Sequence, residues 1–280
     1  MHAICLGLLL FALTPHARAQ SDLPGPFPLP APVHAVVTTR SADGQPILGI
    51  LHGGGLDAQG HLRGAAVALA TPTGTVLWDG FNRGLHPWHL CSGRFAGKDV
   101  LLVGVRKTAP FDPQEAPRPF LYTVKPGGAG LSKVWLGTSL ARPLFALDLA
   151  DLDARGEDEL VALEYGPTGR LSVAAYRWRG FGVEGIARSE EIDGACELAC
   201  EDVSASPGKE AVVRTARGGR YTFLAYQLQG EELTVVARVA VTVGEGPVQW
   251  RLVARSETDP GGILIQRGAV QRLLRFVSPS

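Results

Sequence analysis

The feature that most constrains the fold of this chain is a glycine that recurs at nearly constant spacing. Gly44, Gly97, Gly156, Gly208 and Gly261 each stand in a polar turn between two apolar runs. Successive glycines are 53, 59, 52 and 53 residues apart. A fixed period near 50 residues is typical of a supersecondary unit that buries its apolar faces only by packing against further copies of itself.

Each copy of the unit predicts four strands. The clearest copy covers 148–166, 171–182 and 183–191, and three copies carry a tyrosine at the same place, Tyr122, Tyr176 and Tyr226. Apolar and polar residues alternate in places, and no segment has the period of an amphipathic helix. The sequence therefore predicts an all-β fold, a β-propeller of about five four-stranded blades that forms a single domain over 34–280. A twisted sandwich or an open array of sheets remains as a structural alternative.

The two ends of the chain carry further expectations. Residues 1–19 contain an apolar run from Ile4 to Leu13 and end in Ala17-Arg18-Ala19, so they are interpreted as a bacterial signal peptide that directs the protein to the periplasm or the exterior. No later run is long and apolar enough for a membrane helix. Residues 20–33 form a proline-rich, extended lead-in. The last copy lacks a convincing fourth strand, and we expect the N-terminal segment to complete that blade and remove its open edge.

Charge and cysteine content exclude some classes of protein. Lys and Arg together number 27, as do Asp and Glu, so no excess of charge favours nucleic acid as a partner. Beyond the signal the chain has three cysteines, too few for a disulfide scaffold. Cys196 and Cys200 on one strand lie about 13 Å apart and cannot pair with each other. Pairing of Cys91 with one of them, or three buried thiols, both remain open.

One turn carries a resemblance to a known repeat. The block DLADLDARGEDEL at 148–160 resembles the FG-GAP or VCBS-type repeat of bacterial propellers, which has the pattern D-x-D-G-D-G-x-x-E-L. Asp151, Asp153, Gly156, Glu159 and Leu160 match it. The resemblance implies a propeller blade and a calcium site at Asp151 and Asp153.

The same turn departs from the pattern where calcium would need it most. Ala154 stands at a glycine position, and Arg155 replaces the third carboxylate, so a guanidinium opposes a cation there. None of the other four turns has three spaced acids. A turn capped by its own side chains is therefore favoured over a calcium site, and no other cofactor is expected.

Catalytic patterns are weak in this chain. His52-Gly53-Gly54-Gly55 matches an oxyanion loop of esterases, but there is no G-x-S-x-G and no histidine after His89, which excludes that serine-hydrolase order. His86 and His89 flank Pro87-Trp88. With nearby acids they leave one alternative, a metal-dependent hydrolase or lyase with its site at the propeller mouth.

The longest interval between glycines contains an insertion, TAPFDPQEAPRP at 108–119, which is interpreted as a loop. Long loops on a rigid repeat scaffold frequently carry binding. Aromatic and basic side chains of this region are the candidate ligand-binding residues: Trp88, Arg106, Lys107, Phe111, Arg118 and Arg142. We therefore expect a noncatalytic binding or scaffolding protein that recognises a protein, peptide or glycan through its blade loops. A structural subunit of an envelope assembly is the third possibility.

Overall fold

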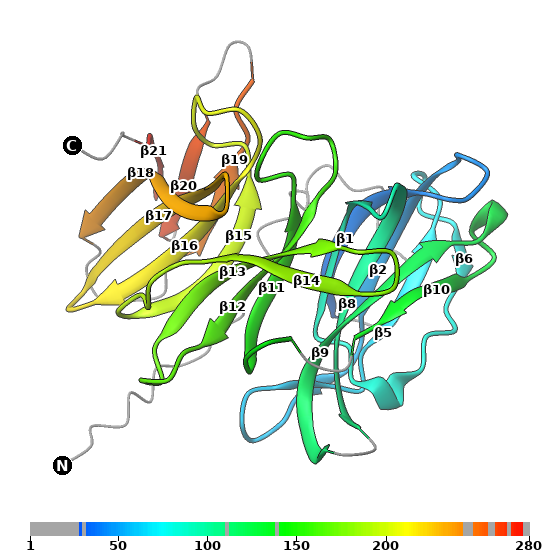
Figure 1. Cartoon of the computed structure of the whole chain (residues 1–280). Coiled ribbons are helices and arrows are strands. Elements are labelled where there is room, and N and C mark those ends of the chain that lie inside the picture. The colour runs from blue at the N-terminus through cyan, green and yellow to red at the C-terminus, as the bar shows by residue number, and fades with distance from the viewer. Residues whose placement is uncertain are drawn as a thin grey trace.

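The computed structural model describes residues 28–29, 32–109, 112–137, 140–242, 249–256, 261–267 and 270–276. They form five antiparallel sheets that follow one another around a common axis, as Figure 1 shows from the blue strands of the first to the red strands of the last. The predicted all-β propeller of five blades is therefore confirmed. No helix within these ranges has the length and apolarity needed to cross a bilayer.

Within each blade the chain pairs consecutive strands of the sheet. The first blade consists of β1 (Val33–Arg40), β2 (Pro46–His52), β5 (Ala66–Ala70) and β6 (Val76–Trp78). The second consists of β7 (His89–Phe95), β8 (Lys98–Ala109), β9 (Asp112–Val124) and β10 (Leu131–Leu136). The third consists of β11 (Leu144–Ala150), β12 (Glu159–Tyr165), β13 (Leu171–Trp178) and β14 (Val183–Arg188).

The remaining strands complete the ring and one small ribbon. The fourth blade consists of β15 (Ala195–Glu201), β16 (Glu210–Arg217), β17 (Arg220–Gln229) and β18 (Glu232–Thr242). The fifth has three described strands, β19 (Gln249–Val253), β20 (Gly262–Arg267) and β21 (Val270–Leu274). A ribbon of β3 (Gly55–Leu56) and β4 (Leu62–Arg63) projects from the first blade, and two short 3-10 helices cover Arg83–Leu85 and Pro126–Gly128.

The blades are held together by apolar side chains that alternate along each strand. In β8, Leu101 and Val103 are buried in the cluster shared with the first blade. Val100 and Leu102, on the opposite face of the same strand, are buried in the cluster shared with the third blade. Successive side chains of a strand point to opposite faces, so one strand fills two interfaces between blades. Further clusters join the third blade to the fourth and the fourth to the fifth.

The glycines that mark the period have a common backbone conformation. All five have a positive φ, between +71° and +87°, a region that glycine enters without a Cβ clash. The turns also join neighbouring blades. The amide of Asp158 donates to the carbonyl of Arg94 at 2.7 Å, and the amide of Lys209 donates to that of Asp151 at 2.8 Å. The repeat is therefore visible in the sequence because its turn requires glycine.

The predicted closure of the last blade by the N-terminal segment falls largely outside the described residues, as do residues 1–19. What the structure does describe of the lead-in lies on the first blade. Val33 begins β1, and Leu29 packs against Val36, Leu48 and Ile50 of the first blade. This apolar contact covers first-blade residues that belong to a cluster separate from the one shared with the second blade.

Candidate binding face

The predicted loop at 108–119 is wrong in its secondary structure. Strands β8 and β9 continue through it as a long hairpin, paired from Leu101 and Tyr122 out to Ala109 and Asp112. The prolines that suggested a loop are tolerated because β10 ends opposite Phe120, which leaves the earlier part of β9 as an edge strand. Proline has no amide hydrogen and is confined to such edges within sheets. Phe111, at the tip, lies outside the described residues.

Two of the predicted binding residues support the hairpin itself. The side chain of Arg118 is buried, with 2% of the residue exposed, and its Nε donates to the carbonyl of Lys107 at 3.2 Å. The Lys107 Nζ lies 5.7 Å from the centre of the Phe120 ring. Arg118 is thus held inside the hairpin and is not presented to a partner in this conformation. Arg142 precedes β11, and its backbone amide hydrogen-bonds to the carboxylate of Glu164.

The other two predicted residues, Trp88 and Arg106, lie together. The Arg106 guanidinium carbon is 5.9 Å from the centre of the Trp88 ring, a cation–π arrangement. The indole Nε1 donates to the carbonyl of Val105 at 3.3 Å. Gly104 leaves room for the indole, because a Cβ there would lie 2.9 Å from Trp88 Cε2. The sequence therefore fixes the tryptophan against the strand that carries the arginine.

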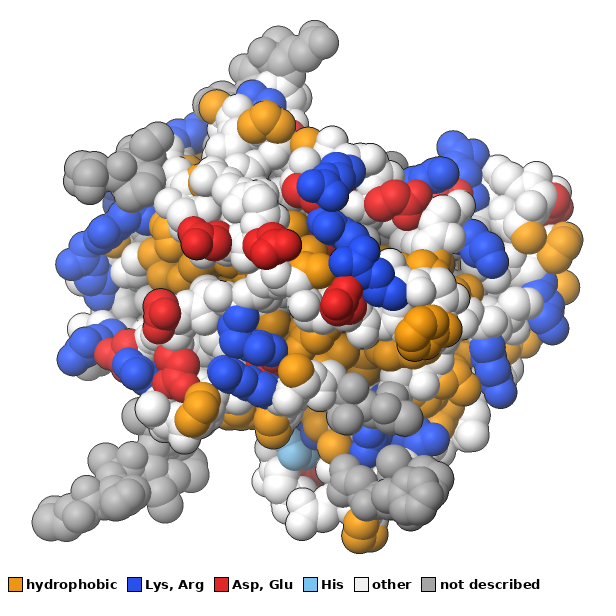
Figure 2. Space-filling view, viewed as in Figure 1, with side chains coloured by type: hydrophobic (Ala, Val, Ile, Leu, Met, Phe, Trp, Pro, Cys, Tyr) orange, Lys and Arg blue, Asp and Glu red, His pale blue; other side chains and the backbone are white. Residues whose placement is uncertain are grey.

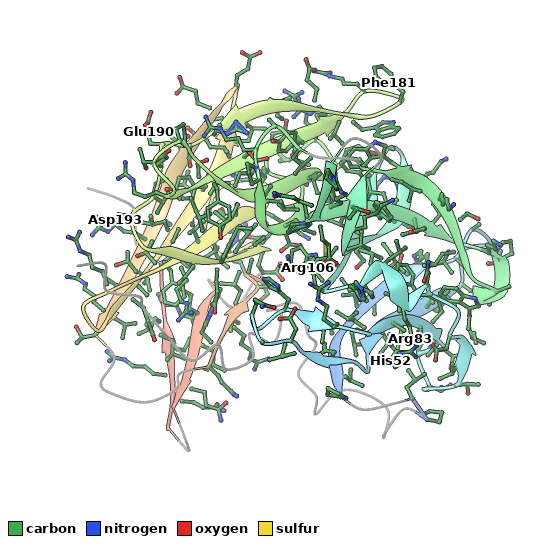
Figure 3. All side chains as sticks on the ribbon, turned by 90° about the horizontal axis from the view of Figure 1, so that it is seen from below. His52, Arg83, Arg106, Phe181, Glu190 and Asp193 are labelled. Atoms are coloured by element: carbon green, nitrogen blue, oxygen red, sulfur yellow. The ribbon has the colours of Figure 1, made fainter. Side chains whose placement is uncertain are left out.

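Arg106 is a poorly satisfied cation. Its Nε is buried and has no hydrogen-bond partner within the described part of the chain. Burial, followed by repulsion from Arg63, lowers the pKa of Arg106. A guanidinium carries five N–H donors, and a desolvated donor without an acceptor costs about 1–3 kcal/mol. Figure 3 shows Arg106 near the middle of the molecule as it is seen from below.

Two exposed aromatic side chains that the sequence does not single out lie on the neighbouring third blade, one of them near Arg106. Phe145 on β11 and Tyr165 at the end of β12 form an edge-to-face contact with ring centres 5.8 Å apart, and they are 37% and 41% exposed. Tyr165 is close enough to Arg106 to interact with it electrostatically. We call this set, Trp88, Arg106, Phe145 and Tyr165, the Arg106 face. No local sequence pattern marks Phe145 and Tyr165, because they come from two strands that meet only in the folded blade.

Charged residues border the Arg106 face on the side of the first blade. Arg63 on β4 donates from its Nε to Asp57 at 2.9 Å and also pairs with Glu115 on the hairpin, which joins the ribbon to β9. The backbone hydrogen bond from His61, together with Arg63, lowers the pKa of Asp57 to about 2. Burial and the charge of Arg106 lower the pKa of His61, so that this imidazole is neutral at pH 7. The border is therefore a set of paired charges around one incompletely paired arginine.

Other exposed groups do not join the Arg106 face. Phe181, 89% exposed, is at the turn between β13 and β14. Figure 3 places it well away from Arg106. The face turned to the viewer in Figure 2 carries acidic and basic side chains over β13 and β14, with exposed hydrophobic side chains below them.

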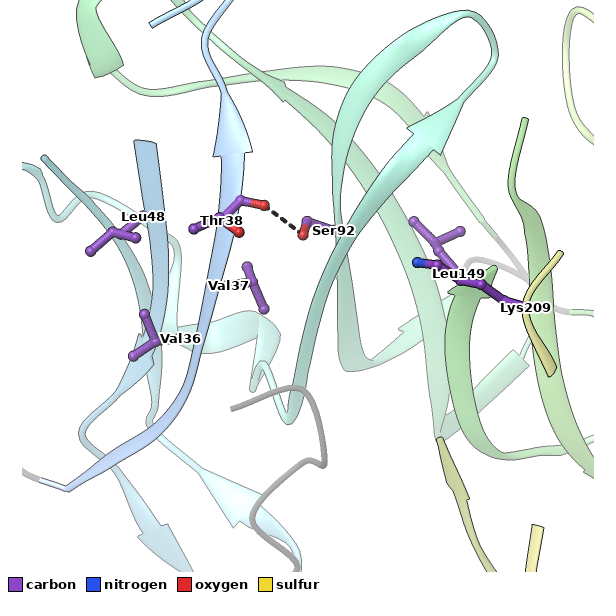
Figure 4. A pocket seen from close by; sticks show the side chains of 7 residues that line it. All are labelled: Val36, Val37, Thr38, Leu48, Ser92, Leu149 and Lys209. Carbon is purple, nitrogen blue, oxygen red and sulfur yellow. Dashed lines mark hydrogen bonds between the residues drawn. The ribbon is translucent and has the colours of Figure 1, made fainter. Parts of the chain in front are cut away.

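A separate cavity lies along the inner strands. It has a volume of about 420 Å³ and is lined by Val36, Val37, Thr38, Leu48, Ser92, Leu149 and Lys209 (Figure 4). The Ser92 hydroxyl closes one wall by donating to the carbonyl of Thr38 at 2.7 Å. Burial disfavours the charge of Lys209, but the attraction of Asp158 and Glu201 outweighs it and raises the pKa. The lysine is therefore cationic and is balanced by carboxylates, which does not suit a nucleophilic amine.

The two histidines of the alternative enzyme prediction occupy different environments. His86 has a left-handed backbone, with φ of 45°, and caps the 3-10 helix beside the Arg106 face. His89, only 7% exposed, lies in the interior, within 4.8 Å of ligand atoms of Cys91 and Asp148. Cys91, Cys196 and Cys200 are all free thiols.

The turn at which the repeat resemblance implies calcium does not fit a calcium ion. Asp151, Asp153 and Glu159 do converge, with carboxylate oxygens within 4.8 Å. However, Arg177 reaches across from β13, and its Nη2 lies 2.6 Å from both Asp153 and Glu159. Asp151 is used to cap the turn, accepting the amides of Arg155 and Gly156 at 2.9 and 2.8 Å. A guanidinium thus stands among the oxygens that a cation would need.

Comparison with known proteins does not assign the chain to a family. A scan against family models finds no match for the chain, and a search of curated proteins finds none either. The propeller architecture and the Arg106 face are therefore the observations from which function is argued.

Proposed function

We propose that this protein is an exported, noncatalytic propeller that binds a protein, peptide or glycan through the Arg106 face. The observation that carries the proposal is the half-buried Arg106, whose Nε has no acceptor in the described structure and whose guanidinium contacts Trp88. Interface residues that contribute most to affinity are enriched in Trp, Tyr and Arg. A ligand group with an acceptor oxygen would satisfy the arginine and pack on Phe145 and Tyr165.

The proposal is tested best by a single substitution at Arg106 and not by replacement of the whole segment 108–119. Replacing all of 108–119 by glycine and serine would remove the buried Arg118 and disrupt the hairpin. Arg106→Gln removes the cation alone and keeps a side chain of similar length. Arg217→Gln is the matched control, because the side chain of Arg217 is 84% exposed on the fourth blade and pairs with an exposed Asp193.

The experiment is binding of the three purified proteins to arrays of glycans and peptides. We expect the native protein and Arg217→Gln to bind the same probes, and Arg106→Gln to lose them by at least ~10-fold in affinity, since hydrogen bonds to charged groups contribute about 1.5–3 kcal/mol. Equal binding by Arg106→Gln, or no binding by the native protein, would refute the assignment of this face.

We further propose that the blades are FG-GAP or VCBS-type repeats of a bacterial, exported protein. The match at Asp151, Asp153, Gly156, Glu159 and Leu160 supports the repeat, and the run Ile4–Leu13 before Ala17-Arg18-Ala19 supports export to the periplasm or the exterior. N-terminal sequencing of the protein recovered from the periplasm or the medium should begin at Gln20. An intact Met1 would contradict export by cleavage.

The metal-dependent hydrolase or lyase is not favoured, since His89 is buried in the interior, whereas His86 caps a 3-10 helix. The third possibility, a structural subunit of an envelope assembly, can be distinguished from a ligand-binding protein with the same variants. It predicts a stable complex in native extracts that survives in Arg106→Gln, together with no binding on the arrays.

A further inference from the structure

Three donor atoms of three different kinds meet in the interior of the propeller. His89 and Cys91 are two residues apart on β7, so both side chains leave the same face of the strand. Asp148 faces them from β11, the innermost strand of the next blade. One ligand atom from each, nitrogen, sulfur and oxygen, lies within 4.8 Å of the other two. The three residues are 7%, 1% and 2% exposed.

The carboxylate is held in place by backbone groups of two blades. Asp148 Oδ1 accepts the amide of Leu149 at 2.8 Å, and Oδ2 accepts the amide of Cys200, on β15 of the fourth blade, at 2.9 Å. The Cys91 thiol also hydrogen-bonds to it. A carboxylate oxygen has further lone pairs after one such bond. Groups that orient a ligand in this way are a common part of metal sites.

A further thiol lies near these three atoms, although it is not within 4.8 Å of all of them. The Cys200 thiol is buried and close enough to interact electrostatically with both Cys91 and Asp148. Two cysteines, one histidine and one carboxylate form a tetrahedral set of the kind that zinc accepts, whereas calcium and magnesium prefer oxygen alone. Bond lengths of about 2.0–2.3 Å place tetrahedral ligand atoms roughly 3.5 Å apart, so the Cys200 side chain has to turn toward the three clustered atoms when the ion binds.

The surrounding charge suits the metal-bound form. A divalent ion with two thiolates and one carboxylate carries a net charge of about −1. The cationic Lys209 interacts electrostatically with both Cys200 and Asp148. Burial of a thiolate without such partners is costly, and a metal ion together with this lysine would offset that cost.

We propose that His89, Cys91, Asp148 and Cys200 bind a zinc-type divalent transition-metal ion that joins the second, third and fourth blades. Binding displaces the thiol protons of Cys91 and Cys200 to solvent, and both sulfurs coordinate as thiolates. Because all four residues are buried, the site is structural and takes up its ion as the protein folds.

The test uses the full-length protein, stripped of metal by a chelator under reducing conditions and then titrated with Co²⁺ and Zn²⁺. We expect about one Zn²⁺ per chain by elemental analysis, a cysteine-to-cobalt charge-transfer band, and a rise in the thermal midpoint on adding Zn²⁺. Cys91→Ser should weaken Zn²⁺ affinity by more than roughly 100-fold and reduce the band.

Cys196→Ser is the matched control. Cys196 lies on the same strand as Cys200, but its thiol donates to the carbonyl of Arg214 at 3.3 Å, and the charged groups near it are Arg214 and Glu197. This variant should bind Zn²⁺ and Co²⁺ as the native protein does. Absence of the band in the native protein, or its loss in Cys196→Ser and retention in Cys91→Ser, would overturn the proposal. Because the native spectrum alone can refute it, the test holds even if Cys91→Ser folds poorly.

Discussion

Arg177 provides the positive charge in the turn where the repeat resemblance predicted calcium. It is 27% exposed and joins two nearly buried carboxylates, Asp153 at 9% and Glu159 at 3%. Arg155, in the same turn, contacts Asp153 at 3.0 Å but is 66% exposed. The sequence showed Arg155 as the group that opposes a cation, yet the structure gives that part mainly to Arg177, 24 residues beyond Asp153. Spacing within a motif could not have shown this contact from another strand.

Substitution of Arg177 should therefore destabilise the protein much more than substitution of Arg155. Arg177→Met leaves the buried Glu159 without this counter-charge and Asp153 with the exposed Arg155 in its place, and we expect a loss of about 2–3 kcal/mol in the free energy of unfolding. Arg155→Met, the control, should cost less than ~0.5 kcal/mol because its ion pair is exposed. Urea denaturation measures both. Equal losses would show that the Arg177 network does not stabilise the blade.

Glu210 gives the fold a pH dependence of defined sign. It is fully buried, and burial raises its pKa even though the Ser204 hydroxyl and the Val203 amide bond to the carboxylate. Since the folded state then holds the proton more tightly than the unfolded state, the contribution to stability is complete below the unfolded pKa near 4.5 and is lost as pH rises through the folded pKa.

This pH dependence is tested by measuring the free energy of unfolding of the native protein and of two variants across pH. Between about pH 5 and pH 8, the free energy of unfolding of Glu210→Gln should fall less than that of the native protein, because the amide does not ionise. Some decline should remain, since burial also raises the pKa of Glu159 and Glu164. Glu232→Gln, at an exposed strand end, should leave the native profile unchanged. A steeper decline in Glu210→Gln would reverse the argument.

At the scale of the element, the turns and the hairpin differ in how far the sequence predicted them. The turns were predictable because each needs a left-handed glycine, and that requirement is local. The β8–β9 hairpin was not, because its prolines suggest a loop unless it is known that β10 stops short and leaves β9 as an edge. Phe145 and Tyr165 were missed for a related reason: they come from two strands, and only the assembled ring brings them to Arg106.

Substitution of two turn glycines tests how closely the turns of neighbouring blades approach each other. Gly156 and Gly208 have nearly the same φ, +82° and +87°. A Cβ on Gly156 meets nothing within 4 Å, whereas one on Gly208 would lie 2.7 Å from the carbonyl oxygen of Asp151 in the preceding blade. Gly156→Ala should cost about 1 kcal/mol for its conformation alone. Gly208→Ala should cost ~1–3 kcal/mol more, measured by urea denaturation, because backbone must move. Equal costs would exclude a close contact between the turns.

At the scale of the whole molecule, the sequence predicted the number of blades, and its prediction that the N-terminal segment closes the last blade falls largely outside the described residues. The four apolar clusters between consecutive blades follow from the alternation of side chains along each strand, and that alternation can be seen in the sequence. Within the described residues, no cluster joins the fifth blade to the first, and Leu29 packs on the first blade instead. Such a contact depends on a segment without periodicity, so pattern analysis had no signal for it.

The fifth blade should consequently open more readily than the blades in the middle of the ring. It has three described strands, and Leu264 and Gln266 of β20 are only partly buried, whereas β12 is buried along all but its last position. Few buried apolar contacts mean a lower free energy of local opening. We expect the amides of β20 to exchange with deuterium roughly tenfold or more faster than those of β12, equivalent to ~1.4 kcal/mol or more in opening free energy. Hydrogen exchange resolved by mass spectrometry measures this, with β13 as a second reference from the same blade as β12. Uniform protection across β12, β13 and β20 would mean that the ring opens only as a whole, and that the fifth blade is held by contacts as strong as those between the second and third.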